Sequence, residues 1–107
     1  MTSDKLAPLD PVIHSQVRLA VISILASAER ADFNFLKKAA ETTDGNLSTH
    51  LARLEEAGYI AIEKSFQRKR PLTTCVLTEK GRAAFRDYLE ALESYFPRPR
   101  NRDAESG

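Results

Sequence analysis

Residues 33–77 set the expected order of helices and strands, and they read FNFLKKAAETTDGNLSTHLARLEEAGYIAIEKSFQRKRPLTTCVL. Apolar residues at three- and four-residue steps predict a short helix over 35–42 and a second over 46–57, separated by a turn at 43–45. Gly58 ends the second helix. Two strands are expected over 59–66 and 73–77. The tip at 67–71 joins them, and Pro71 marks this tip as a turn. Asp32 and Phe33 are candidates for a further short strand in the same sheet.

This order of elements is typical of a helix-turn-helix followed by a basic hairpin, the winged helix. The second helix of such a motif can enter the major groove of DNA, and the hairpin, or wing, can hold backbone phosphates. Leu47, Leu51 and Leu54 form the inward stripe of that helix. The candidate DNA-contacting residues are therefore Asn46, Ser48, Thr49, His50 and Arg53 on the helix, with Lys64, Arg68, Lys69 and Arg70 on the wing. Asp44 is expected to be the N-cap of the helix.

Two segments carry a resemblance to a known family. Residues 46–60, NLSTHLARLEEAGYI, resemble the recognition helix and first wing strand of the MarR/ArsR-like winged-helix regulators. Residues 77–82, LTEKGR, are similar to the stretch that leads into the last helix of those proteins. The resemblance covers about residues 10–96. It implies a minimal dimeric transcription factor, bacterial or archaeal, without a separate sensor domain.

Helices are also expected on both sides of this motif. Asp10 and Pro11 predict a helix start, and the helix then runs to about Ala28 with two apolar faces. Thr78 predicts the N-cap of a last helix, which Pro97 ends. The second face of the first helix and the stripe of the last one predict a homodimer interface made of Leu19, Ile22, Tyr88, Leu89, Leu92, Tyr95 and Phe96.

The fold class expected from these elements is mainly α with a small β-hairpin (α+β): a winged helix-turn-helix with an additional C-terminal dimerisation helix. A chain of 107 residues has room for one such domain. We expect an N-terminal extension over 1–9, the winged-helix domain over 10–96 and a disordered tail over 97–107.

Composition excludes several classes of function. With 16 basic and 15 acidic residues the chain is not a bulk polycation, so a DNA site has to come from local charge on the wing. A single cysteine excludes an internal disulfide, and His14 and His50 lack partners at metal-ligand spacing, so neither metal nor cofactor is expected. No set of residues suggests catalysis. The absence of a membrane-spanning run or a secretory signal predicts a cytoplasmic protein without a membrane partner.

The sequence predicts a sequence-specific DNA-binding regulator whose partners are an inverted-repeat DNA operator and a second copy of itself. It leaves an alternative open, a winged-helix protein-interaction module that does not bind DNA. The two differ on the basic wing, which an interaction module does not need. A third hypothesis, a thiol sensor, would require an exposed and stabilised Cys75 thiolate. A buried cysteine on a strand more often serves as a small apolar core residue.

Overall fold

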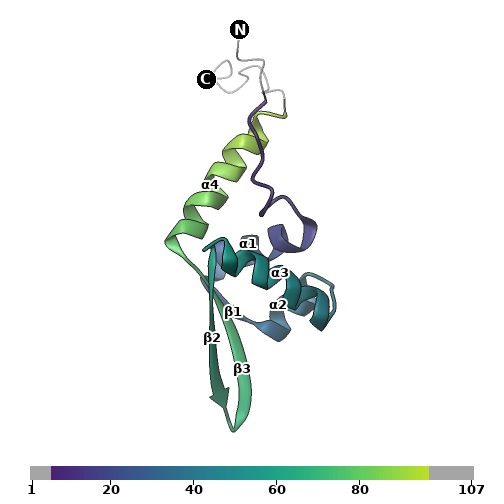
Figure 1. Cartoon of the computed structure of the whole chain (residues 1–107), viewed down its shortest axis with the longest axis vertical. Coiled ribbons are helices and arrows are strands. Elements are labelled where there is room, and N and C mark those ends of the chain that lie inside the picture. The colour runs from purple at the N-terminus through teal and green to yellow at the C-terminus, as the bar shows by residue number, and fades with distance from the viewer. Residues whose placement is uncertain (1–5, 97–107) are drawn as a thin grey trace, which may run out of the picture.

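The computed structural model describes residues 6–96. Its helices are α1 (Gln16–Ala28), α2 (Phe33–Ala39), α3 (Asp44–Glu56) and α4 (Glu79–Glu93), and its strands are β1 (Arg30–Asp32), β2 (Ile60–Gln67) and β3 (Arg70–Leu77). Figure 1 shows the first three helices gathered beside the base of the sheet, with the β2–β3 hairpin projecting away from them. Helix α4 runs in the opposite direction. The expected α+β winged-helix class is confirmed.

The sheet has the strand order β1-β3-β2, and both pairs are antiparallel. Strand β1 is the third strand expected near Asp32, although Phe33 belongs to α2. The hairpin is longer than the sequence predicted, because β2 and β3 continue to a turn of only two residues, Arg68 and Lys69. Pro71 therefore lies inside β3 rather than in the turn. It is tolerated there because β1 pairs only with residues 74–76, which leaves β3 with a single neighbour at Pro71.

Helix α1 lies at the centre of the core. Its buried side chains pack with Leu36 of α2, with the three inward leucines of α3 and with Ile60, Cys75 and Leu77 of the sheet. Ile22 is fully buried in this single chain. The second apolar face of α1 is thus covered at Ile22 by the chain itself, so this predicted interface residue has no exposed surface in the single chain.

The start of α1 differs from the expected one. The helix begins at Gln16, and the Ser15 side chain accepts the N-cap hydrogen bond from the backbone N–H of Arg18. Asp10 instead closes a separate turn, in which its Oδ1 accepts from the Val12 N–H at 2.8 Å. An aspartate can hydrogen-bond the backbone two residues ahead, and this local bond competes with helix formation.

Helix α4 begins as expected, because the hydroxyl of Thr78 accepts from the Gly81 N–H at 2.9 Å. It ends at Glu93, so Tyr95 and Phe96 lie beyond it. Residues 6–9, the described part of the predicted extension, run beside the end of α4, where Tyr95 Oη donates to the Ala7 carbonyl at 3.0 Å. Pro97 and the predicted tail lie outside the described residues. None of the helices within residues 6–96 has both the length and the apolar character needed to cross a membrane.

Candidate nucleic-acid interface

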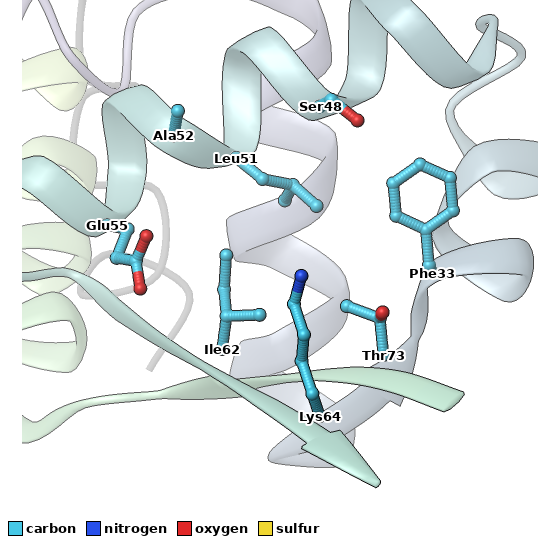
Figure 2. A pocket seen from close by; sticks show the side chains of 8 residues that line it. All are labelled: Phe33, Ser48, Leu51, Ala52, Glu55, Ile62, Lys64 and Thr73. Atoms are coloured by element: carbon cyan, nitrogen blue, oxygen red, sulfur yellow. The ribbon is translucent and has the colours of Figure 1, made fainter. Parts of the chain in front are cut away.

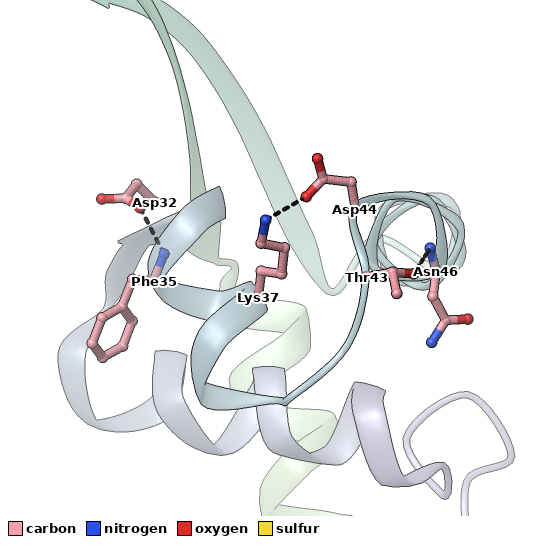
Figure 3. A network of polar contacts seen from close by, with 6 residues as sticks. All are labelled: Asp32, Phe35, Lys37, Thr43, Asp44 and Asn46. Carbon is pink, nitrogen blue, oxygen red and sulfur yellow. Dashed lines mark hydrogen bonds and ion pairs between the residues drawn. The ribbon is translucent and has the colours of Figure 1, made fainter.

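Three polar contacts fix the start of α2 and the turn between α2 and α3 (Figure 3). Asp32 caps α2 by accepting from the Phe35 N–H at 2.9 Å. Thr43, and not Asp44, is the N-cap of α3, and its hydroxyl accepts from the Asn46 N–H at 3.2 Å. Asp44 is the first helical residue. Its carboxylate pairs with Lys37 of α2 at 2.8 Å, which joins the two helices, and its negative charge suits the first turn of α3.

The predicted inward stripe of α3 is confirmed, since Leu47, Leu51 and Leu54 are all buried. This orientation leaves one polar arc exposed, consisting of Asn46, Ser48, Thr49, Ala52 and Arg53. Within it the Thr49 hydroxyl donates to the Gly45 carbonyl at 3.1 Å, and the Asn46 amide donates to Thr42 at 2.6 Å. The Arg53 side chain has no hydrogen bond or ion pair within residues 6–96. The arc therefore offers a free guanidinium and several short polar groups.

His50 lies between α3 and α1 rather than on the fully exposed arc. Its Nδ1 is 2.8 Å from a guanidinium nitrogen of Arg18, a residue of α1 that is only 9% exposed. Because arginine can only donate, Nδ1 must accept, and a neutral His50 then carries its proton on Nε2. Burial lowers the pKa of His50, and the charges of Arg18 and Arg53 lower it further.

Sequence reasoning missed Arg18. The guanidinium also donates to the backbone carbonyls of Val12 and Pro11, so it joins the segment before α1 to the helix α3. One signal was present in the sequence. Arg18 stands one helical turn before Val21 and Ile22, among the inward positions of α1 rather than on its polar side.

Two of the four wing cations lie on a strained turn. Lys64, Arg68, Lys69 and Arg70 are all exposed. Arg68 and Lys69 have φ values of 54° and 66°. A two-residue hairpin turn with both φ angles positive favours Asn-Gly. A long side chain resists this left-handed region at a cost of roughly 1–2 kcal/mol, because its Cβ comes close to the following carbonyl oxygen. Two long cationic side chains thus occupy positions where smaller residues are more stable.

A hollow of about 580 Å³ separates α3 from the wing sheet. It is lined by Phe33, Ser48, Leu51, Ala52, Glu55, Ile62, Lys64 and Thr73. Figure 2 shows the side chains of Ser48 and Thr73 and the ammonium of Lys64 around this hollow, with Leu51 and Ile62 facing each other across it. Two of the predicted site residues, Ser48 and Lys64, are therefore brought to one hollow, which joins the exposed side of α3 to the wing.

Comparison with known proteins identifies the family. The model for the winged helix DNA-binding domain matches residues 17–96. The chain belongs to the winged helix DNA-binding domain family. This match confirms the resemblance carried by residues 46–60 and 77–82. In this fold α3 is the second helix of the helix-turn-helix, and the β2–β3 hairpin is the wing.

Three relatives illustrate the likeness. The uncharacterized protein MJ0432 of Methanocaldococcus jannaschii is 40% identical over 78 residues, which are 73% of this chain and 85% of that protein. The structure of a transcriptional regulator homologue from Pyrococcus horikoshii is 27% identical and has a TM-score of 0.73, with 78% of this chain and 83% of that one covered. AbfR is a protein of Staphylococcus epidermidis, and the structure of its reduced form bound to DNA shares the fold at 24% sequence identity. Its TM-score is 0.66, with 82% of this chain and 61% of that one covered.

Cys75 lies in the core of this winged-helix domain and not at its surface. Burial and the nearby charge of Glu55 raise the pKa of its thiol to about 11. A buried, protonated thiol is a poor nucleophile, and this removes the basis of the thiol-sensor hypothesis. Within residues 6–96, no cluster of three His, Cys, Asp or Glu side chains could hold a metal ion.

The residues expected at a dimer interface fall into two groups. Tyr88 is buried in the single chain, and its hydroxyl lies 2.9 Å from Nδ1 of His14, so like Ile22 it belongs to the packing of one chain. Leu89, Tyr95 and Phe96 are exposed by 45%, 40% and 61%. Leu19 and Leu92 are half-buried. The exposed members of this predicted interface thus lie on α4 and just after it, and α4 runs away from the wing (Figure 1).

Proposed function

We propose that this winged-helix chain is a sequence-specific DNA-binding transcriptional regulator that acts as a homodimer. In this proposal α3 enters the major groove and the wing holds adjacent phosphates. One observation carries it: residues 64–71 contain four cations and no acidic residue, on a hairpin that lines one hollow together with Ser48 and Ala52 of the exposed α3 arc. The family and the DNA-bound relative with the same fold support DNA as the partner.

The chemistry of the α3 arc suits base recognition. A free Arg53 guanidinium can donate two hydrogen bonds to guanine, and Asn46 can pair with adenine. Ser48 and Thr49 can bond to phosphate or base edges, and His50 can add a donor through Nε2. The first turns of α3 carry small side chains around Gly45, which allow the helix backbone to approach the groove closely.

The strain in the wing turn supports a role for its charges. A turn that only had to join two strands would be more stable with Asn-Gly than with Arg68 and Lys69. Backbone strain that persists in a fold is often associated with function. Contacts from Arg68, Lys69, Arg70 and Lys64 to phosphates would raise affinity for every DNA sequence and make binding sensitive to salt.

The exposed apolar surface of Leu89, Tyr95 and Phe96 supports the homodimer of this proposal. Exposed apolar patches of this kind commonly mark protein contacts. A two-fold axis near the end of α4 would present two α3 helices to DNA. The half-sites would then lie about 34 Å apart, or a small multiple of that distance, and the operator would be an inverted repeat.

The salt dependence of duplex binding tests this function. Wild type and the triple variant Arg68→Gln, Lys69→Gln, Arg70→Gln would be titrated with a fluorescent DNA duplex at several salt concentrations. Each phosphate contact that the variant lacks should flatten the log-log slope by about one unit. Arg86→Gln, an exposed cation on α4, is the matched control and should keep the wild-type slope. Equal slopes and affinities for wild type and the triple variant would favour the interaction-module alternative.

A further inference from the structure

Phe66 is the most exposed large apolar residue in the described chain, with 73% of its surface open to solvent. It lies near the end of β2. Because side chains alternate along a strand, Ile60, Ile62, Lys64 and Phe66 share one face of the sheet. Ile60 is buried and Ile62 is half-buried, whereas Phe66 is exposed and lies one residue pair before the pair that closes the hairpin turn. The turn end of the hairpin projects away from the helices (Figure 1). The apolar face of the sheet therefore continues past the part that the chain's own helices cover.

The surroundings of Phe66 restrict what can cover it. Pro71 lies opposite Phe66 in the strand register and is exposed as well, so the two residues form one apolar patch, the wing patch. Its neighbours along the chain are the four wing cations, with no acidic residue in 64–71. A patch that is apolar at its centre and positive around it complements a surface that is apolar between rows of negative charge.

The side of the sheet that the wing patch faces further restricts what can cover Phe66. Ile62, on the same face of β2 as Phe66, lines the hollow together with Ser48 and Leu51 of α3. Phe66 therefore faces the side of the sheet on which the recognition helix lies. A duplex that filled its major groove with α3 would pass along this side of the wing.

We propose that Phe66 enters the minor groove of DNA next to the segment read by α3, with its ring against the deoxyribose walls and Arg68, Lys69 and Arg70 on the flanking phosphates. Proteins that bind the minor groove use Arg and Lys side chains there and frequently insert an apolar side chain such as Phe as well. The inference rests on the proposed function. It adds an apolar contact to that function, and such a contact releases no counterions from the DNA.

A lipid surface with negative headgroups would also attract an aromatic ring surrounded by cations. DNA is favoured because the wing patch shares its side of the sheet with the polar arc of α3. That arc offers groups for base edges, and Ala52 is its one apolar side chain, which is too little apolar surface to enter a bilayer.

A tryptophan probe tests the contact directly, because the chain contains no tryptophan. In Phe66→Trp the only indole lies on the wing patch, and in Ser65→Trp it lies on the opposite face of the same strand. With a mixed-sequence duplex at low salt, Phe66→Trp emission should become shielded from acrylamide, while Ser65→Trp stays accessible. Equal accessibility of both variants in the complex overturns the inference. Shielding by phosphatidylserine vesicles but not by the duplex overturns it in favour of a lipid surface.

Affinity measurements separate this inference from the proposed function. Phe66→Ala should weaken duplex binding about tenfold through loss of a buried ring, yet leave the salt slope unchanged because no phosphate contact is removed. A wild-type affinity in Phe66→Ala, with wild type binding duplex normally, would overturn the minor-groove contact alone. A wild-type chain that binds no duplex would overturn the proposed function, and this inference with it.

Discussion

Gly81 lets the start of α4 pack closely against the backbone just before β2. A Cβ at this position would lie 2.1 Å from the Tyr59 carbonyl oxygen, a backbone atom that cannot move aside alone. We expect Gly81→Ala to lower the free energy of unfolding by about 1–3 kcal/mol or more, as overpacked sites do. Urea denaturation would measure it. Gly45→Ala is the matched control, since nothing lies within 4 Å of its Cβ position and alanine favours a helix by up to about 1 kcal/mol. A stable Gly81→Ala would contradict the close packing.

The His50–Arg18 contact makes stability depend on pH. The pKa of His50 is lowered in the folded chain from its ordinary value of 6.5, chiefly by burial. As the pH falls below 6.5, His50 takes up a proton in the unfolded chain, whereas folded His50 stays neutral to a lower pH. Protonation therefore favours the unfolded chain, and the free energy of unfolding that is present above pH 6.5 decreases. We expect the melting temperature of wild type to fall more steeply below this pH than that of His50→Gln. Parallel profiles would show that the contact does not influence titration.

Some residue positions could be predicted from the sequence and others could not. The inward leucines of α3 followed from helical spacing, because one face had to be buried. The caps were harder, since Asp10, Asp44, Ser15 and Thr43 are all good capping residues. Which of them caps depends on where the backbone first becomes extended, and tertiary contacts such as Lys37 with Asp44 influence that choice.

Among the elements, the wing turn gives the sharpest prediction. Replacing Arg68 by Asn and Lys69 by Gly provides the residues that a turn with two positive φ angles favours. The double variant should gain roughly 1 kcal/mol in stability from the relief of strain. It should also bind duplex DNA more weakly, with a salt slope flatter by up to about two units. Thermal denaturation and duplex titration would measure the two effects, and tighter DNA binding by the stabilised variant would contradict the role given to the turn.

The elements themselves were largely readable from the sequence. Periodicity placed the helices and the hairpin, because each buries one face. It could not place the hairpin's end, since residues 67–71 carry no apolar alternation, and Pro71 indicated a turn although an edge position accepts it. Nor could periodicity show that α4 ends at Glu93, because Tyr95 and Phe96 continue the apolar spacing after the helix has stopped.

For the whole molecule, the exposed end of α4 predicts association. A double variant, Leu89→Glu with Phe96→Glu, should sediment as a monomer at micromolar concentration, where wild type should sediment as a dimer. The reason is that both side chains are exposed in the single chain and would be buried only in a partner contact. Lys38→Gln, on α2, should remain dimeric. A monomeric wild type at this concentration would contradict the proposed assembly.

The sequence indicated which helices have a second apolar face. It did not show which apolar side chains of that face stay exposed in the folded chain. Ile22 and Tyr88 resembled interface residues by their spacing, yet both are buried within one chain. Their partners come from segments far away in the sequence, such as His14 for Tyr88, and no local pattern reveals such contacts.

Selection of DNA sites tests the central claim, sequence-specific recognition by α3, most directly. Wild type and Arg53→Ala would each be used to select sequences from a pool of random duplexes. We expect wild type to enrich an inverted repeat, and Arg53→Ala to lose preference at one position of each half-site. That loss should correspond to about 1–3 kcal/mol on the preferred site, with non-specific affinity nearly unchanged. No enrichment by wild type, or the same enriched sequence from both proteins, would contradict the claim.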